Sequence, residues 1–207
     1  MISRRSLLLG ALGTAAAAST ARAESAMDAF LDSIGLDPSS GGTGRQRAFR
    51  LDPQFRPQTV SYSGRERSGT IVIDVANKFL YHVNGDGSAR RYGIGVGRDG
   101  FRWAGAARVG RKAEWPTWTP PRAMIRRQPE LRQWAGGMPG GPENPLGARA
   151  LYLYRGGRDT LYRIHGTNAP WSIGQAMSSG CIRMMNEHVE ELYERVRIGS
   201  RVIVRQV

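Results

Sequence analysis

The sequence has a single cysteine, Cys181, among its 207 residues, so no disulfide can form within one chain. It also lacks an apolar run long enough to cross a membrane comfortably. The best candidate, residues 7–18, is short and rich in alanine, glycine and threonine. These two shortages argue against a disulfide-stabilised scaffold and against an integral membrane protein. The fold must therefore be stabilised by its hydrophobic core alone.

Residues 1–23 have the features of an export signal. Arg4 and Arg5 form a charged start, residues 7–18 an apolar centre, and residues 21–23 an Ala-Arg-Ala cleavage site. The SRRSLL sequence at residues 3–8 resembles the twin-arginine signal of bacterial exports. We therefore predict a periplasmic protein, exported by the twin-arginine route, without a transmembrane segment in the mature chain. An uncleaved membrane anchor is the alternative, and the short Ala-rich centre argues against it.

The chain has few acidic residues, 17 against 30 lysines and arginines, which gives a net charge of +13. Removing the three arginines of the signal leaves +10. A basic protein can bind nucleic acid, but no nucleic-acid-binding motif is present, so we predict no nucleic-acid partner. In an exported protein this charge favours anionic cell-wall material or lipid headgroups. The alternative is a solvated basic surface, and charge alone does not decide between them.

Export changes how Cys181 is interpreted. A lone cysteine is more often a small buried apolar residue than a nucleophile. In an oxidising compartment, however, structural cysteines come in pairs, so an unpaired one is either a dimer bridge or a reactive thiol. Cys181 follows the polar turn sequence Ser178-Ser179-Gly180 and does not lie in an apolar run. This context favours the reactive thiol.

A histidine in the right context accompanies the cysteine. His165 ends an apolar, strand-like segment and is followed by Gly166 and Thr167, where a strand gives way to a loop. A thiol and an imidazole suffice for nucleophilic acyl transfer, since the imidazole takes the thiol proton and later returns one to the leaving group. Gly180 would let the backbone N–H groups near Cys181 approach a developing oxyanion.

The rest of the chain indicates a tail followed by one domain that is mainly β with short helices. Linker composition at residues 38–44 and prolines at 53 and 57 predict a tail or linker over residues 24–64, with a short amphipathic segment at 27–34. Residues 65–207 form the predicted domain. Its expected strands, read from β-branched and apolar runs, are residues 70–75, 79–83, 91–97, 150–154, 160–165 and 201–204.

Three further segments complete the predicted domain. Residues 115–145 contain three tryptophans and seven prolines, with a short helix opened by Pro121, and either cover the site or plug the core edge. Residues 172–177 are expected to form a short helix capped by Ser172. A clearer helix follows, capped by Asn186 and buried through its 3.6-residue period. His188 is expected on its surface, and His82 is taken as a strand residue without a catalytic role.

The motif sequences, YRIHGTN at residues 162–168 and SSGCIRM at 178–184, followed by Asn186, closely resemble the L,D-transpeptidase catalytic domain of the YkuD type. The resemblance covers roughly residues 69–207. It implies a β-sandwich catalytic domain with Cys181 as the nucleophile, His165 as its base and the Gly166 carbonyl as the partner of the histidine. Gly180 belongs to the same catalytic turn. Neither the motifs nor the resemblance implies a cofactor or a metal site.

The resemblance also implies the substrate. The enzyme would attack the third, L-linked residue of a peptidoglycan stem peptide, release D-alanine and form a thioester. The acyl group would pass to a stem-peptide amine, giving a 3-3 cross-link, or to a lysine of an outer-membrane protein, or to water. Arg183, Ser179 and Thr167 would lie on the substrate side; for Arg183 a structural ion pair is the alternative. Carbapenems would acylate Cys181.

The chain departs from the family pattern at one position near the nucleophile. Many relatives have a histidine two residues before the cysteine, where this chain has Ser179, so His165 carries the assignment of the base. Because a cysteine beside an imidazole often has a lowered pKa, we expect the same for Cys181. The competing interpretations are a Cys/His wall endopeptidase, in which the cysteine usually comes before the histidine, an L,D-carboxypeptidase, and a non-catalytic wall-binding module.

Overall fold

The computed structural model describes residues 49–97, 104–178 and 180–206. The chain divides into residues 1–48 and a compact unit from Phe49 to Val207. The predicted export signal, the segment at 27–34 and Ser179 lie outside the described residues. Within the described ranges, no helix is both long and apolar enough to cross a bilayer.

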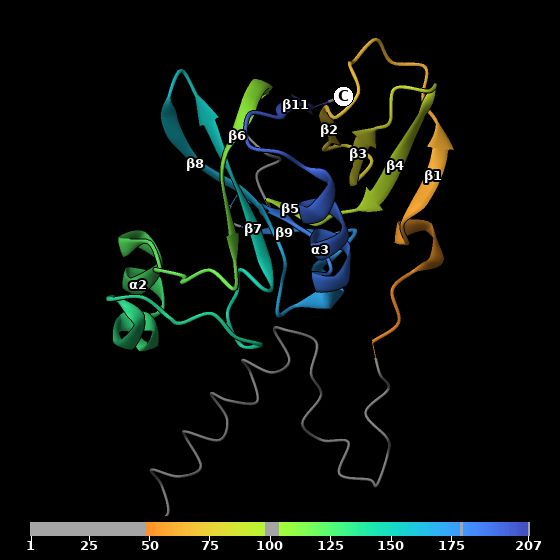
Figure 1. Cartoon of the computed structure of the whole chain (residues 1–207). Helices are drawn as coiled ribbons and strands as arrows, with labels where there is room; N and C mark the ends of the chain where they lie inside the picture. Colours follow the sequence, from red (N-terminus) through yellow and green to blue (C-terminus); the bar gives the residue numbers. More distant parts are fainter. Residues whose placement is uncertain (1–48, 98–103, 179, 207) are drawn as a thin grey trace, which may run out of the picture. The chain divides into compact units, whose positions relative to one another are not determined.

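The compact unit is built on one large mixed β-sheet (Figure 1). Its nine strands follow the order β1-β4-β3-β2-β11-β6-β7-β8-β10. Most neighbours pair antiparallel, whereas β11 pairs parallel with β2 and β10 pairs parallel with β8. The strands are β1 (Gln58–Ser61), β2 (Ile71–Asp74), β3 (Phe79–Val83), β4 (Ser88–Gly93), β6 (Gly105–Glu114), β7 (Arg149–Arg155), β8 (Arg158–His165), β10 (Ile182–Arg183) and β11 (Arg201–Arg205).

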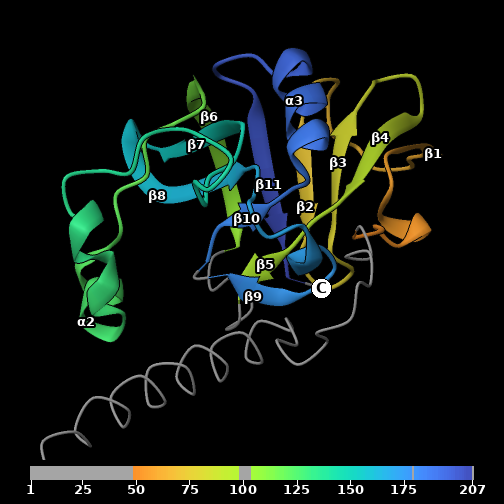
Figure 2. The same cartoon turned by 90° about the horizontal axis from the view of Figure 1, so that it is seen from below.

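The two halves of this sheet face each other across the core, with helix α3 (Asn186–Arg195) between them (Figures 1 and 2). Val189 and Leu192 of α3 are fully buried, as the predicted helical period requires. They join a single apolar cluster that draws on β2, β3, β4, β6, β7, β8, β10 and β11. The predicted mainly β fold with short helices is confirmed.

Local sequence signals account for much of this sheet. The β-branched run before Asp74 forms β2, whose three apolar residues are at most 1 % exposed. The Asn-Gly-Asp-Gly sequence links β3 to β4 as a hairpin, with Gly85 and Gly87 at φ +92° and +81°. The sheet itself begins within the predicted linker, however. Gln58–Ser61 form β1 at the sheet edge, paired with β4, so residues 49–64 belong to the compact unit.

The prediction of a helix at 172–177 is wrong. A 3₁₀ turn, η3 (Pro170–Ser172), ends there, and Gly174 at φ +83° redirects the chain into strand β9 (Ala176–Ser178). This strand pairs in parallel with β5 (Val96–Gly97) to form a separate two-stranded sheet. The predicted strand over 91–97 is thus divided between β4 and β5. A three-residue strand has too short a pattern to be distinguished from a helical turn.

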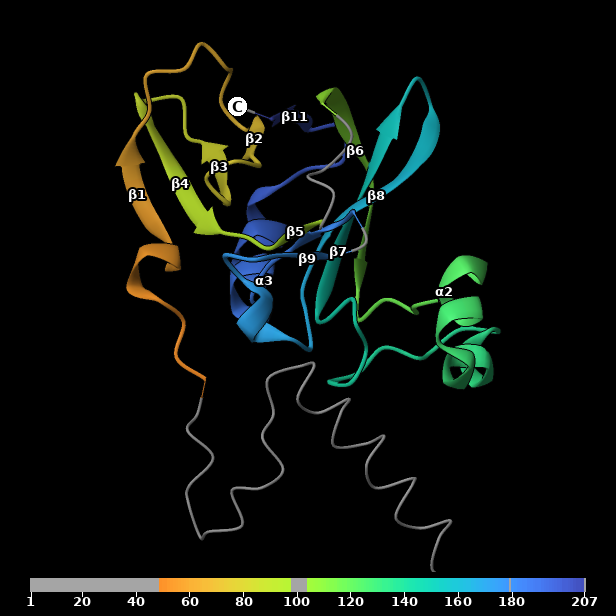
Figure 3. The same ribbon diagram turned by 180° about the vertical axis from the view of Figure 1, so that it is seen from behind.

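The Trp/Pro-rich segment lies outside the sheet (Figure 3). It contains helix α2 (Arg122–Arg127), for which Pro121 is the N-cap and not the first residue, and the 3₁₀ helix η2 (Pro129–Trp134). A further 3₁₀ turn, η1 (Pro53–Phe55), precedes β1. Asn144 is fully buried and ties the segment together, since its amide donates to the carbonyls of Pro116, Met138 and Pro139.

The two histidines assigned no catalytic role are both buried. His82 lies on β3 as predicted and is 8 % exposed. The prediction that His188 lies on the surface is wrong, because it is 7 % exposed and its ring packs against Tyr92 of β4 at 6.3 Å between centroids. The first turn of α3 is covered by the sheet, which a single helical period does not reveal.

Candidate active site

Strand pairing brings the two predicted catalytic residues together. β10 pairs with β8 so that Ile182 lies opposite Ile164 and Arg183 opposite His165. Both isoleucines are fully buried in the core, so alternation directs His165, Cys181 and Arg183 to the other face of this strand pair. Cys181 is therefore a diagonal cross-strand neighbour of His165. The pairing of β10 with β8, at one edge of the sheet (Figure 2), thus places two residues that are sixteen positions apart in the sequence on neighbouring strands.

The alternation of side chains along β8 is regular only near its end. His165 ends β8, as predicted. Strict alternation would put Leu161 on the same face as His165, but Leu161 adopts φ +64° beside a register shift in the β7–β8 pair and is 75 % exposed. The irregularity interrupts the alternation, so only Arg163 and His165 share the face.

The His165 ring is held in one tautomer. Its Nδ1 lies 2.6 Å from the Gly166 carbonyl oxygen, and the ring is 4 % exposed. A carbonyl can only accept, so Nδ1 carries the proton and Nε2 presents a lone pair. Burial lowers the pKa of His165 to about 4, against the opposing effect of the Gly166 hydrogen bond. At neutral pH the imidazole is therefore uncharged and able to accept a proton.

Burial acts on the thiol in the opposite sense to our expectation. Desolvation raises the pKa of Cys181, and it outweighs a backbone hydrogen bond from Arg163 and the charges of Arg163 and Arg183. The Sγ atom lies 4.0 Å from the Leu161 carbonyl oxygen. The expected low thiol pKa is thus wrong for the resting site, in which the Cys181 thiol and the His165 imidazole are both neutral. Proton transfer must then accompany the attack.

The turn before the cysteine requires glycine. Gly180 adopts φ +126°, a region that side-chain-bearing residues rarely occupy, and a Cβ there would lie 3.4 Å from the Tyr162 ring. Ser179, the middle residue of the predicted Ser178-Ser179-Gly180 turn, lies outside the described residues. The backbone of Gly180 and Cys181 lies directly before β10.

Asn186 is the residue whose role the sequence prediction missed. It is the first residue of α3 and not its cap; Met185 takes the cap position without a side-chain cap hydrogen bond. The Asn186 Oδ1 instead accepts from the N–H groups of Ala148 at 3.0 Å and Thr167 at 3.1 Å. A Cβ on Gly166 would collide with this oxygen. Asn186 thereby holds the loop that supplies the hydrogen-bond partner of His165.

Thr167 and the Trp/Pro-rich segment border a pocket beside this loop. The Thr167 hydroxyl accepts from the Ala169 N–H at 3.0 Å, and the residue is 4 % exposed. A pocket of about 340 Å³ joins Thr167 and Asn186 to Trp115. Trp115 is 44 % exposed, and the segment's other two tryptophans are partly exposed as well. This exposure favours a groove wall over a plug of the core edge.

The two arginines near the thiol differ in how their charges are balanced. Arg163 forms a two-point ion pair with Asp159, at 2.8 and 2.9 Å. The Arg183 backbone is fixed by reciprocal 2.9 Å hydrogen bonds with Gly95. Its guanidinium has no ion pair or hydrogen bond with any residue that the structure describes, and burial lowers its pKa. Among the described residues, Arg163 forms a structural ion pair and Arg183 does not, so the alternative role considered for Arg183 is not supported.

A protein metal site usually needs several His, Cys, Asp or Glu ligands close together. Within those ranges, no cluster of three or more histidine, cysteine, aspartate or glutamate side chains could hold a metal ion. The site contains a thiol, a neutral imidazole whose Nε2 carries a lone pair, and a guanidinium that forms no ion pair with a described carboxylate.

Comparison with known proteins identifies the same region. The family model of the L,D-transpeptidase catalytic domain, YkuD, matches residues 68–204. The "Probable L,D-transpeptidase ErfK/SrfK" of Escherichia coli K12 is 37 % identical over 155 residues, which cover 70 % of this chain and 46 % of that protein. The "Probable L,D-transpeptidase YbiS" of the same strain is 35 % identical over 156 residues, covering 70 % and 47 %. The chain thus matches about half the length of these curated relatives.

One solved structure is more similar in sequence. A crystal structure from Brucella melitensis, described as a "Probable carnitine operon oxidoreductase caia", is 51 % identical and covers 75 % of this chain and 96 % of that one, with a TM-score of 0.53. The oxidoreductase name describes that protein and is not carried over to this chain. The domain that the family model matches begins just before β2 and ends within β11. This chain belongs to the L,D-transpeptidase catalytic-domain family.

Proposed function

We propose that the protein is a cysteine-dependent L,D-transpeptidase that acts on peptidoglycan stem peptides through a thioester on Cys181. The observation that carries the proposal is the hydrogen bond between His165 Nδ1 and the Gly166 carbonyl. It leaves Nε2 as the only basic nitrogen of the ring, on the face where Cys181 lies one strand away.

The acylation step uses this pair directly. The Cys181 sulfur attacks the carbonyl of the third stem-peptide residue while His165 Nε2 takes the thiol proton. The tetrahedral intermediate collapses as the imidazolium returns that proton to the amine of the leaving D-alanine, and a thioester remains. In the second step an acceptor amine attacks the thioester, His165 takes its proton, and the thiol is regenerated. The Gly166 carbonyl stabilises the imidazolium in both steps.

The neutral resting pair fits this sequence of events. With the pKa of His165 at about 4 and that of Cys181 raised, neither group is charged before substrate binds. Charge develops only as the sulfur attacks, so the oxyanion needs donors that are already in place. We assign that role to the backbone N–H groups at Gly180 and Cys181, because the φ of Gly180 fixes the turn that carries them.

The substrate side is assigned to Arg183, Thr167 and Ser179. Arg183 is the strongest of the three, because a half-buried guanidinium without a described partner suits a substrate carboxylate. Thr167 borders the pocket beside Trp115, which we take as a wall of the peptide groove. Ser179 rests on its position in the motif, before Gly180 and Cys181.

We place this reaction in the periplasm, on the grounds of the export signal over residues 1–23 and its twin-arginine sequence. The acceptor is then a stem-peptide amine, which gives a 3-3 cross-link, or a lysine of an outer-membrane protein. Transfer to water would make the enzyme an L,D-carboxypeptidase. The order of the motifs, with His165 before Cys181, favours a transpeptidase over a wall endopeptidase, in which the cysteine usually comes first. A non-catalytic wall-binding module would give this cysteine and histidine no role.

Incubation of the mature chain with purified sacculi, followed by muropeptide analysis, tests the proposal. We expect new 3-3 cross-links, shortened stems or peptide-linked protein, none of which Cys181→Ala should produce. Cleaved cross-links without new ones would favour the endopeptidase. Products identical for wild type and Cys181→Ala would contradict the proposal.

A further inference from the structure

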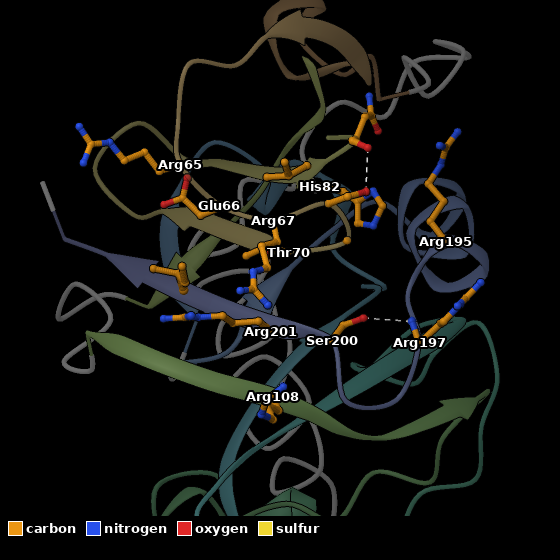
Figure 4. Close-up of a pocket in the computed structure, with 15 residues that line it drawn as sticks. Arg65, Glu66, Arg67, Thr70, His82, Arg108, Arg195, Arg197, Ser200 and Arg201 are labelled. Carbon is orange, nitrogen blue, oxygen red and sulfur yellow. Dashed lines mark hydrogen bonds between the residues drawn. The ribbon is translucent and has the colours of Figure 1, made fainter. Parts of the chain in front are cut away.

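An arginine-lined pocket includes Arg195, the last residue of α3 (Figure 4). Its volume is about 950 Å³. Asn186, at the first residue of α3, holds the loop after His165, whereas Arg195 ends the helix at the pocket. Nine helical steps separate Asn186 from Arg195, which is about 14 Å along the helix axis. The pocket and the active site share no residue.

Six arginines from different elements line this pocket. They come from the segment before β2, from β6, from the end of α3 and the turn after it, and from β11: Arg65, Arg67, Arg108, Arg195, Arg197 and Arg201. Figure 4 shows their side chains around the opening, with Thr70 and Ser200 among them. These six arginines are far apart in the sequence and come close to one another only in the folded protein.

Carboxylates balance little of this charge. Glu66, which also lines the pocket, is engaged by Arg205 and by the Tyr62 hydroxyl. Arg195 pairs with Glu191, which also holds Arg90. Within the described parts of the chain, the other five pocket arginines form no ion pair, and a guanidinium cannot discharge by losing its proton. Like charges around a concave surface repel one another and focus a positive potential outward.

A buried histidine at the same pocket supplies an independent observation. His82 lines the pocket, is 8 % exposed, and neither ring nitrogen has a hydrogen-bond partner among the residues that the structure describes. Burial, together with the charge of Arg195, lowers its pKa, so the ring is neutral and can donate one hydrogen bond. An unsatisfied buried polar group is costly, so a hydrogen-bond acceptor that enters the pocket would stabilise the His82 ring.

A solvated basic surface explains the arginines but not His82. Exposed guanidinium groups lose little by facing water, whereas a buried imidazole gains a partner only if a ligand or water enters the pocket. A compact anion with several oxygens satisfies both features, since it neutralises several arginines and accepts from the ring N–H. A phosphate group has the charge and the number of acceptors that this arrangement requires.

We propose that this pocket binds the phosphate group of an anionic ligand, with Arg67 and Arg201 as charged donors and His82 as the innermost donor. The ligand is either a soluble phosphorylated molecule or the headgroup of a phospholipid. The binding is independent of acyl transfer, because no group of the pocket belongs to the catalytic site.

Calorimetric titration of the mature chain with inorganic pyrophosphate, at ionic strength held constant with sodium chloride, tests the shared chemistry. The His82 ring signals, followed by NMR, report on the pocket itself. We expect saturable binding and a shift of those signals. Arg67→Gln/Arg201→Gln should weaken binding by about tenfold or more. The matched control Arg126→Gln/Arg158→Gln removes two exposed charges elsewhere and should bind like wild type.

Vesicle sedimentation distinguishes a phospholipid headgroup from a soluble phosphorylated ligand. Phosphatidylcholine vesicles with and without phosphatidic acid are sedimented with the protein, in the presence and absence of pyrophosphate. Binding that requires phosphatidic acid and is displaced by pyrophosphate identifies a lipid headgroup; pyrophosphate binding without vesicle binding identifies a soluble ligand. Absence of saturable binding to either probe would overturn the proposal. So would equal loss in the two double variants, because general charge attraction would then explain the binding.

Discussion

Two buried histidines near opposite ends of α3 differ in what their ring nitrogens contact. His165 donates from Nδ1 to the adjacent Gly166 carbonyl, and the loop that provides this carbonyl is held by Asn186. His82 lies among arginines with neither ring nitrogen bonded to a described residue. Both have lowered pKa values because both are buried.

The comparison shows that burial alone does not define a catalytic histidine. At the N-terminal end of α3 the protein fixes the orientation of the imidazole internally, which is what a general base requires before substrate arrives. At the C-terminal end neither ring nitrogen of His82 has a hydrogen-bond partner among the described residues, and the anion site that we propose would supply one. The third histidine, His188, packs against Tyr92 within the core and offers a control for the loss of a buried imidazole.

The largest expected effect is on the rate of acylation. His165→Gln removes the base, so acylation of Cys181 should slow by about 10²–10⁴-fold. His188→Gln also removes a buried imidazole, but not one at the site, and should acylate close to the wild-type rate. Stopped-flow absorbance during carbapenem ring opening measures both. Similar slowing in the two variants would mean that general loosening of the core, and not the base, sets the rate.

The pH dependence of stability should reveal the same histidine. His165 has a folded-state pKa of about 4, below its ordinary 6.5, so the unfolded chain binds more protons between these values. Its contribution is therefore full above pH 6.5 and is lost as the pH falls towards 4, by roughly 3 kcal/mol. Urea unfolding across this range should show a shallower decline in His165→Gln. Parallel profiles for the two proteins would contradict the lowered pKa.

A smaller effect is expected when Asn186, which holds the loop after His165, is replaced. Asn186→Ala leaves the Ala148 and Thr167 N–H groups without their acceptor, which should cost about 1–3 kcal/mol in unfolding free energy. Acylation should slow as well, at a temperature where the variant is folded, because the Gly166 carbonyl loses its fixed position. Asn186→Asp retains the acceptor oxygen and should restore most of the rate.

The control for this variant lies on the same helix. Glu194→Ala, at an exposed position near the other end of α3, should change neither stability nor rate appreciably. If Asn186→Ala lost stability while acylating normally, Asn186 would support the fold but would not position the site.

The smallest expected effect comes from replacing either of two glycines that have a positive φ. Comparing the two variants distinguishes backbone strain from a role in acylation. Gly180→Ala and Gly87→Ala each place a side chain at a positive φ, +126° and +81°, and each should cost about 1 kcal/mol of stability. Only Gly180 belongs to the turn before Cys181, so only Gly180→Ala should also slow acylation. Equal acylation rates in both variants would remove the turn from the catalytic arrangement.

Sequence reasoning succeeded where the information is local. The β-branched run of β2, the Asn-Gly-Asp-Gly hairpin and the period of α3 each determine their own structure, and the His–Gly and Gly–Cys motifs identified the family. The confirmed fold follows from these segments, because each one is long enough to display its own period.

What could not be predicted depends on contacts between distant segments. An asparagine at a helix start is typical of a cap, and only the fold shows its Oδ1 bonded to Ala148, 38 positions earlier. The short strand β9 exists because β5 pairs with it. The raised pKa of Cys181 results from burial that the thiol–imidazole motif does not encode. The arginine pocket likewise arises from four segments that share no motif.

Intact-protein mass spectrometry of the mature chain incubated with a carbapenem tests most directly whether Cys181 is the nucleophile and His165 its base. The chain has one cysteine, so the site of a thioester is unambiguous. We predict one adduct per chain that retains the mass of the ring-opened drug, none on Cys181→Ala, little on Cys181→Ser, and slow accumulation on His165→Gln. A full adduct on Cys181→Ala or Cys181→Ser, or wild-type kinetics in His165→Gln, would contradict these assignments.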